Sequence, residues 1–189
     1  MVTQLKNAGG RRRLVIAYVD IGEAERWRIY WKSWWQAPRN GRPGVPSFLV
    51  APDPDVWGGC FPVAYWYSRW QGIIATGARS ILSLLLDDGF DGIYMDWVEA
   101  YDDTQVKARA RADGVNAARE ILSFIRTIRT TAQERDPDFL VIAQNAPDLI
   151  TGHPGYPQII DGITQRRPPA TDAILGALDL LPLPAVLPH

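Results

Sequence analysis

The sequence predicts an α/β fold with a parallel sheet, because strand-like and helix-like segments alternate along the chain. The apolar runs at residues 14–19, 90–95 and 139–143 are continuous rather than alternating, which is typical of strands buried on both faces. Segments with helical periodicity separate them. The chain has 189 residues, of which 47% are hydrophobic and 22% are charged, as expected for one globular domain.

The first predicted strand, residues 14–19, ends at the turn signal Asp20-Ile21-Gly22. Residues 23–35 follow as a short helical or irregular aromatic segment. Residues 38–46 contain three prolines and two glycines, which indicates a loop. A second short apolar run at residues 47–51 is expected to form another buried strand.

An amphipathic helix is predicted after Ser68, which can cap it, and Asp87-Asp88-Gly89 is expected to stop it. Its apolar face follows the i, i+3, i+4 rule at Trp70, Ile73, Ile74, Gly77, Ile81, Leu84 and Leu85. The strand at residues 90–95 comes directly afterwards and ends at Asp96.

A long helix is predicted over residues 104–134, with Asp102, Asp103 or Thr104 as its cap. Asp136-Pro137 ends it, because the residue before a proline disfavours the helical conformation. The strand at residues 139–143 then leads into Gln144-Asn145, and residues 159–163 read as a fifth strand.

Polar residues follow several of these strands, namely Asp20, Asp53, Asp96 and Asn145. In parallel α/β folds the carboxyl ends of the strands are where functional sites are built. No strand is followed by a glycine-rich phosphate loop, so nucleotide binding is disfavoured.

Asp96 is the first candidate for a catalytic group, because burial and neighbours at a strand end can tune the pKa of a carboxyl. The alternative is that Asp96 caps a loop or pairs with an arginine; the other polar strand ends favour a site. Asp20 has the same geometry at another strand, or it stabilises a turn with Gly22. Glu23 belongs to the same group, or it sits in the first turn of a helix.

Gln144 and Asn145 offer amide groups suited to hydrogen bonds with sugar hydroxyls. The alternative is that these amides form hydrogen bonds with backbone groups of their own loop. Aromatic faces stack on sugar rings, and six of the eight tryptophans precede residue 67. Half or more of the tryptophans are expected to pack in the core, and Trp31, Trp66 and Trp97 are the expected walls of a site.

Other classes of function are disfavoured by composition. The formal net charge of −1 gives no electrostatic reason to expect a nucleic acid or an anionic membrane as partner. With one cysteine, Cys60, and two separated histidines, no metal site and no cofactor are expected. The first thirteen residues lack the apolar run of a signal peptide, and residues 81–86 are too few to span a bilayer.

Several motifs resemble those of glycoside hydrolase family 114, the endo-α-1,4-polygalactosaminidase-like proteins, in the same order along the chain. They are YVDIGEAE at residues 18–25, PVAYW at 62–66, GFDGIYMDW at 89–97, QN at 144–145 and IDGI at 160–163. The resemblance covers roughly residues 14–165, and its specificity comes from the ordered set rather than from any single motif.

The resemblance implies a (β/α)8 TIM barrel that hydrolyses α-1,4-linked galactosamine-containing polysaccharide, usually outside the cell. It implies that Asp96 is one of two catalytic carboxylates. Asp20 is not the second acid of the family pattern, but it is the substitute that this chain offers. The substrate contacts that we expect come from Tyr18, Glu23, Trp31, Trp66, Tyr94, Trp97, Gln144 and Asn145.

The chain also departs from the family pattern. About five βα units are found where a full barrel needs eight. We expect an N-terminal arm at residues 1–13, a partial barrel domain at 14–165 and a divergent Leu/Pro-rich tail at 166–189. The second family acid is expected near position 166, which is Arg166. The alternative function is therefore a catalytically inactive, carbohydrate-binding or vestigial fragment, and we hypothesise a truncated or frame-shifted family member.

Overall fold

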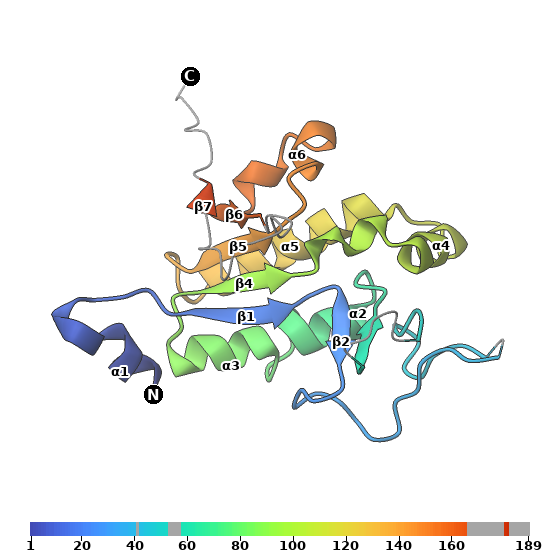
Figure 1. Cartoon of the computed structure of the whole chain (residues 1–189), viewed down its shortest axis with the longest axis horizontal. Helices are drawn as coiled ribbons and strands as arrows, with labels where there is room; N and C mark the ends of the chain where they lie inside the picture. Colours follow the sequence, from blue (N-terminus) through green and yellow to red (C-terminus); the bar gives the residue numbers. More distant parts are fainter. Residues whose placement is uncertain (41, 53–57, 166–179, 182–189) are drawn as a thin grey trace, which may run out of the picture.

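The computed structural model describes residues 1–40, 42–52, 58–165 and 180–181. Its centre is a five-stranded sheet in the order β1-β4-β5-β6-β7 (Figure 1). The first four strands of that order are parallel, and β7 is antiparallel to β6. Their bounds are Ile16–Asp20 for β1, Gly92–Asp96 for β4, Leu140–Gln144 for β5, Gly162–Thr164 for β6 and Leu180–Leu181 for β7. The predicted parallel α/β fold is confirmed.

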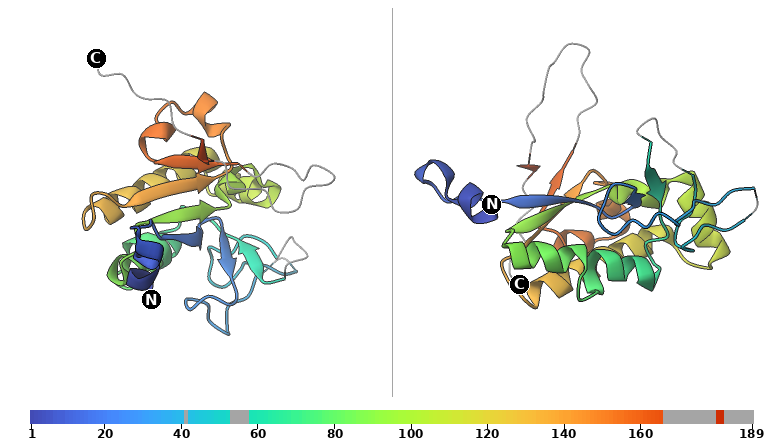
Figure 2. Two further views of the ribbon diagram at one scale, coloured as in Figure 1. Left: turned by 60° about the vertical axis from the view of Figure 1, so that its left-hand side comes forward. Right: turned by 90° about the horizontal axis from the view of Figure 1, so that it is seen from below.

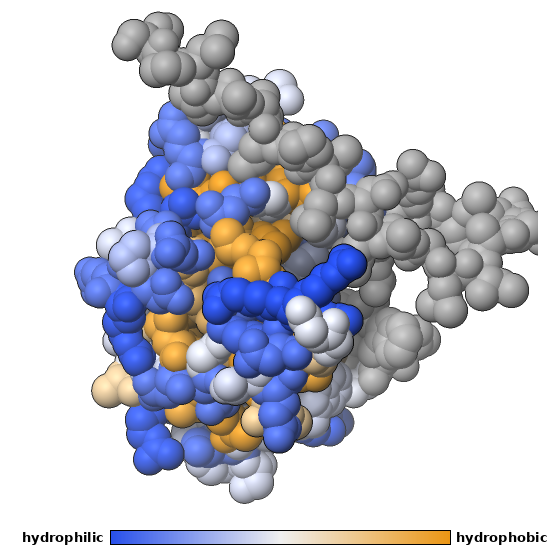
Figure 3. All heavy atoms as spheres, turned by 90° about the vertical axis from the view of Figure 1, so that its left-hand side faces the viewer, coloured by the Kyte–Doolittle hydropathy of each residue, from blue (hydrophilic) through white to orange (hydrophobic). Residues whose placement is uncertain are grey.

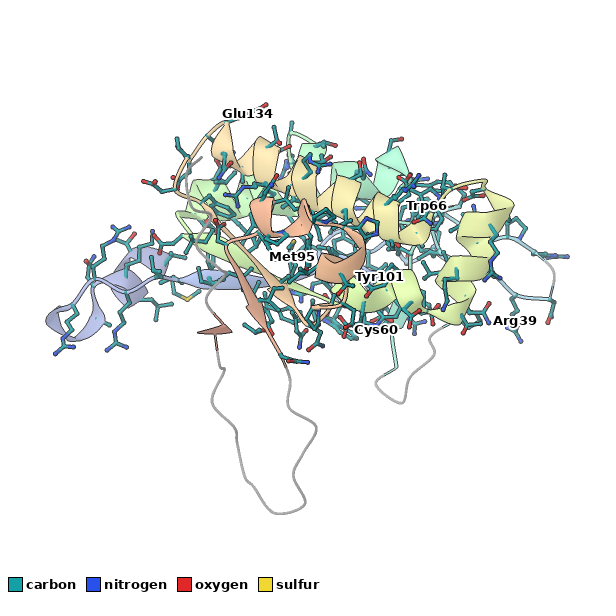
Figure 4. All side chains as sticks on the ribbon, turned by 90° about the horizontal axis from the view of Figure 1, so that it is seen from above. Arg39, Cys60, Trp66, Met95, Tyr101 and Glu134 are labelled. Atoms are coloured by element: carbon teal, nitrogen blue, oxygen red, sulfur yellow. The ribbon has the colours of Figure 1, made fainter. Side chains whose placement is uncertain are left out.

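The helices lie together on one face of this sheet (Figure 2, right). They are α2 (Ser68–Gln71), the π-helical turn η2 (Gly72–Thr76), α3 (Ile81–Asp88), α4 (Thr104–Ala112) and α5 (Ala117–Gln133). The strands alternate, so Ala17, Val19, Ile93 and Met95 are buried toward the helices. Met95, labelled in Figure 4, is 0% exposed at the centre of this layer.

We call the opposite side of the sheet the open face. Side chains two residues apart on each strand share it, and the parallel register aligns them into rows. Its members are Ile16, Tyr18, Asp20, Tyr94, Asp96, Leu140, Ile142, Gln144 and Thr164. Tyr18 is 46% exposed there, whereas its neighbours Ala17 and Val19 are 8% and 6% exposed. This is the face that would line the interior of a closed barrel.

The described strands do not close into such a barrel, because four parallel strands are present where closure takes eight. Within the described residues, β1 is paired with β4 alone and forms an edge of the sheet. The prediction that the barrel is incomplete agrees with this arrangement.

A two-stranded excursion separates β1 from α2. It consists of β2 (Glu23–Glu25) and β3 (Cys60–Pro62), which pair antiparallel. The expectation of a buried strand at residues 47–51 was wrong, because this segment forms only an isolated bridge between Leu49 and Val63. Phe48 and Leu49 are 0% exposed, so their apolar character reflects packing beneath the excursion rather than a place in the sheet.

Both long helices predicted from the sequence are interrupted. The first breaks at Gly77, whose backbone is extended and whose N–H donates to the carbonyl of Gly72 at 3.1 Å. The second breaks between α4 and α5, where Gly114 has a φ of 73° and Asn116 caps α5 by accepting from the Arg119 N–H at 3.0 Å. Asp103 caps α4, as one of the three predicted candidates.

The N-terminal residues form α1 (Val2–Lys6) and η1 (Ala8–Gly10) beside the amino ends of the strands. They are tied to the sheet through Asp91, which accepts from Lys6 at 2.7 Å, from Arg12 at 3.1 Å and from the Val15 N–H at 2.8 Å. Burial alone would raise the pKa of Asp91, but these contacts together lower it. Viewed from this end, hydrophobic residues show between the charged ones (Figure 3).

Candidate active site

The candidate site lies where β1, β4 and β5 end on the open face. Asp20 on β1 is the register partner of Asp96 on β4, and Gln144 on β5 is the register partner of Thr164 on β6. The parallel arrangement therefore places acid, acid, amide and hydroxyl in one row across four strands. From their positions after apolar runs, sequence reasoning predicted that Asp20, Asp96 and Asn145 converge. The structure places Gln144 in the row instead, and the Asn145 side chain contacts Glu99.

Three segments supply hydrogen-bond donors to Asp96: the middle of β1, the backbone just after β4 and the end of β5. The Tyr18 hydroxyl donates to Oδ2, and the Trp97 backbone N–H donates to Oδ1 at 2.7 Å. Turning the Gln144 side-chain amide so that its nitrogen faces this carboxylate makes Gln144 a donor to both carboxylate oxygens. Such an arrangement fixes the orientation of both carboxylate oxygens.

Tyr18 stands on the open face between charged and aromatic neighbours. The Arg28 guanidinium lies 5.6 Å from the centre of its ring, and the Tyr94 ring centre lies 6.4 Å away. Burial and the hydrogen bond to Asp96 raise the pKa of Tyr18 well above its ordinary value, and nearby carboxylates add to this. The hydroxyl therefore keeps its proton and remains a donor to Asp96.

Asp20 is 6% exposed, and its Oδ1 accepts from the backbone N–H groups of Gly22 at 3.0 Å and Glu23 at 2.8 Å. Burial raises the pKa of Asp20 well above its usual range, and the negative charge of Glu23 adds to the effect. Asp20 thus has both of the roles that the sequence suggested, because its side chain stabilises the turn after β1 and it lies beside Asp96.

Glu23 and Glu25 are 7% and 6% exposed on β2, next to this row. Arg28 donates to Glu25 Oε2 at 2.5 Å, and the Glu25 backbone N–H donates to the Tyr30 hydroxyl at 2.9 Å. A cavity of about 30 Å³ lies between these side chains and Tyr18, which is room for water but not for a sugar. This acidic corner borders the site from the side of β1.

On the other side, Tyr94 and Asn145 make polar contacts to β6 and to the segment after β4. The Tyr94 hydroxyl is 2.7 Å from the Thr164 hydroxyl, and the Asn145 N–H donates to the Thr164 carbonyl at 2.7 Å. The Asn145 side chain donates to Glu99 Oε1 at 2.6 Å. Glu99 lies on η3 (Val98–Asp102), and sequence reasoning missed it, although it follows Asp96 by three positions.

Three residues that directly follow β4 and β5 have a strained backbone. Trp97, Asn145 and Ala146 have φ angles of 50°, 56° and 58°, in the left-handed region that residues with a Cβ seldom adopt. Strained residues of this kind cluster at functional sites and persist where the surrounding structure holds them. The short elements α6 (Leu149–Gly152) and η4 (Tyr156–Gln158) follow the strained turn after β5.

The three predicted aromatic walls are not brought together. The Trp97 ring packs over Gly22, at a distance that leaves no room for a Cβ there. Trp31 stacks on Phe61 with ring centres 5.0 Å apart, within the β2–β3 excursion. Trp66 donates to Asp113 at 2.9 Å and lies beside the end of α4 (Figure 4), so it does not wall the row around Asp96. Asp53, Trp57 and Arg166 lie outside the described residues.

Within the described ranges, no group of three or more His, Cys, Asp or Glu side chains is placed to hold a metal ion. No helix in that part of the chain has the length and apolar character needed to cross a membrane. What the site offers is a partly exposed carboxylate held by donors, next to a buried acid of raised pKa.

Comparison with known proteins places this geometry in a family. The model of glycoside-hydrolase family GH114 matches residues 1–160. A Deinococcus radiodurans protein of uncharacterised function is 37% identical over 154 residues, which are 82% of this chain and 44% of that protein. A Thermotoga maritima protein, also uncharacterised, is 35% identical over 136 residues, or 71% of this chain and 38% of that protein. The chain thus spans less than half the length of these relatives.

Two solved structures share the fold. The crystal structure of Ega3 from Aspergillus fumigatus, in complex with galactosamine, matches with a TM-score of 0.61 and 23% identity, over 87% of this chain and 53% of that one. The glycoside hydrolase domain of PelA from Pseudomonas aeruginosa matches with a TM-score of 0.50 and 15% identity, over 82% of this chain and 51% of that one.

Proposed function

Because this chain belongs to glycoside-hydrolase family GH114, we propose that it acts on α-1,4-linked galactosamine-containing polysaccharide, with Asp96 as one member of a catalytic acid pair. The galactosamine bound by Ega3 supports an amino sugar as the ligand class. We assign the activity to a partial barrel domain at residues 14–165, preceded by an arm at 1–13 and followed by a tail at 166–189.

The observation that carries the proposal is the row of polar groups at the carboxyl ends of parallel strands. Asp96 lies in it between Asp20 and Gln144, on the face that would line the barrel. Glycosidases generally use two carboxyl groups, one of which protonates the leaving oxygen while the other attacks or activates water. A carboxylate at the carboxyl ends of parallel strands, held by hydrogen-bond donors, suits the group that attacks or activates water.

Asp20 is the candidate for the second acid in this chain. Burial raises its pKa, which is the direction that a general acid requires. Its 6% exposure and its two backbone hydrogen bonds restrict its access to a glycosidic oxygen. The remaining predicted contacts to the sugar are Tyr18, Glu23, Tyr94, Trp97, Gln144 and Asn145, with Trp31 and Trp66 farther from Asp96.

A second function, binding without catalysis, is favoured by the same restriction on Asp20 and by the arginine at position 166, where the family resemblance predicts the second acid. In that case the Gln144 amide of the row and the Tyr18 and Tyr94 rings of the open face would hold an oligosaccharide that is not cleaved. One carboxylate cannot both protonate the leaving group and activate the nucleophile in the same step.

The two functions are separated by measuring release of reducing ends from α-1,4-linked galactosamine oligosaccharides, together with their binding by calorimetry. Hydrolysis is expected for the wild-type chain, and Asp96→Asn is expected to lower it by at least about 100-fold. Asp87→Asn is the matched control, because Asp87 is a 60% exposed carboxylate on α3 and should leave the rate unchanged.

Binding without hydrolysis in the wild-type chain would select the second function. If the wild-type chain neither binds nor hydrolyses the oligosaccharides, both proposed functions are contradicted. Hydrolysis that survives in Asp96→Asn would remove Asp96 from the chemistry.

A further inference from the structure

Tyr18 contacts the carboxylate on which the proposed chemistry depends. Its hydroxyl donates to Asp96 Oδ2 from the neighbouring strand, and Tyr94 is its register partner on β4. Of the three donors around Asp96, Trp97 N–H lies on the same chain segment and Gln144 is 4% exposed. Tyr18 is the donor that stands on the accessible side, with 46% of the residue exposed.

The orientation of an aspartate carboxylate needs partners of this kind. Rotation about the bond that carries the carboxyl group is broad and roughly two-fold, so the backbone alone does not fix where each oxygen points. Trp97 N–H fixes Oδ1 from one side. The Tyr18 hydroxyl fixes Oδ2, and the two contacts together define the plane of the carboxylate.

Tyr18 is itself held by a chain of contacts that reaches β2. The Arg28 guanidinium lies 5.6 Å from the Tyr18 ring centre, within the range of a cation–π interaction. Arg28 in turn donates to the buried carboxylate of Glu25 at 2.5 Å. The excursion after β1 therefore supports the ring that orients Asp96.

We infer that Tyr18 is the positioning residue of Asp96, held in place by Arg28 and Glu25. This assignment rests on the proposed function, since positioning has a catalytic consequence only if Asp96 takes part in hydrolysis. Tyr18 takes no part in bond making or breaking; it keeps its proton and holds Oδ2 in the direction of the open face.

The test is Tyr18→Phe, which removes the hydroxyl and keeps the ring over Arg28. We expect kcat to fall by about 10-fold to 100-fold, as for the loss of one charge-assisted hydrogen bond, while KM stays within about twofold. Tyr65→Phe is the matched control, because Tyr65 donates a buried hydrogen bond to the Ala117 carbonyl at 2.8 Å, away from the row. It should lower stability and leave kcat unchanged.

A double-mutant cycle distinguishes positioning from general support of the fold. Tyr18→Phe in an Asp96→Ala background should cost less in the urea midpoint of unfolding than it costs alone, because its acceptor is already gone. Additive effects would overturn the inference, as would a wild-type kcat in Tyr18→Phe. The cycle needs no catalysis, so an inactive wild-type chain would contradict the proposed function while the cycle still decides the role of Tyr18.

Discussion

At the scale of single residues, the site depends on a glycine that lets two strand ends approach. A Cβ at Gly22 would lie 2.6 Å from both the Trp97 ring and the Trp97 carbonyl oxygen, and 2.8 Å from the Ala100 Cβ. A backbone oxygen cannot rotate away as a side chain can, so the turn after β1 tolerates no larger residue. Gly22 thereby lets Trp97 follow Asp96 in its strained conformation.

We therefore predict that Gly22→Ala lowers the free energy of unfolding by about 1–3 kcal/mol, as overpacking does. Gly72→Ala is the matched control, because no atom lies within 4 Å of its added Cβ and its backbone is helical. That variant should be neutral or more stable by about 0.5–1 kcal/mol. Urea unfolding of both proteins measures the difference, and equal stabilities would contradict the packing of Trp97 on Gly22.

Asp20 gives a pH-dependent prediction at the same scale. Because burial raises its pKa in the folded state, the folded chain binds this proton more tightly than the unfolded chain, and stability falls as the pH rises above the ordinary value of 3.8. Asp20→Asn keeps an oxygen for the Gly22 and Glu23 N–H groups and has no proton to lose.

The wild type should therefore lose stability relative to Asp20→Asn as the pH rises. The free energy of unfolding of Asp20→Asn minus that of the wild type should be near its lowest below about pH 4 and should increase toward pH 7. Denaturant unfolding between these limits gives the curve. A difference that shrinks as the pH rises would mean that Asp20 is stabilised as a carboxylate in the folded chain.

At the scale of elements, a polar contact joins the segments after β4 and β5. Glu99 Oε1 accepts from the Asn145 side chain at 2.6 Å, and Glu99 Oε2 is buried with no hydrogen-bond partner among the described residues. A buried acceptor in that condition costs free energy. The contact to Asn145 must offset part of that cost and of the strain at Asn145 and Ala146.

Glu99→Ala is predicted to lower the free energy of unfolding by about 1.5–3 kcal/mol, the range for a hydrogen bond to a charged group. Glu99→Gln should retain most of that stability, because its amide oxygen can still accept from Asn145. Thermal unfolding of the two variants makes the comparison. If both lose stability equally, the negative charge of Glu99 matters rather than its oxygen acceptor.

The elements also show what a sequence can and cannot reveal. The three continuous apolar runs became β1, β4 and β5, but the expectation that these strands are buried on both faces was wrong. Helices cover one face, and on the open face Tyr18 is 46% exposed. The run at residues 47–51 looked the same, yet Phe48 and Leu49 are buried under the β2–β3 excursion. Burial alone does not distinguish a strand from a packed loop.

The sequence predicted where helical segments lie better than it predicted where each helix begins and ends. Gly114 and Asn116 carried the signals for a stop and a new cap, but the apolar periodicity of residues 104–134 outweighed them. The convergence of Asp20 and Asp96 was predictable from strand ends, but the amide that joins them is Gln144 rather than the predicted Asn145. The roles of Tyr18, Arg28 and Glu99 were not, because they depend on contacts between segments far apart in the sequence.

At the scale of the whole molecule, the open face leaves side chains exposed that a closed barrel would cover. Ile16, Leu140 and Ile142 are only partly buried there, and β1 forms an edge. Exposed apolar faces and unpaired strand edges favour association between copies. We expect the purified chain to self-associate in a concentration-dependent manner.

Ile142→Lys, which places a charge in the middle of the open face, should shift sedimentation toward the monomer. The control is Leu5→Lys, which changes a 51% exposed leucine on α1 away from that face. Circular dichroism of both variants would verify that the fold is retained. Self-association that Ile142→Lys leaves unchanged would show that the open face is not the contact.

The order of the strands in the sheet has a consequence for how the chain is made. Each parallel strand pairs with the one that comes next in the chain, from β1 to β4 to β5 to β6. Within the described residues, β4, β5 and β6 therefore each find an earlier strand already synthesised, whereas β1 has no partner in the sheet until β4 is made. A polypeptide with this arrangement can assemble progressively during translation, once β4 has been made.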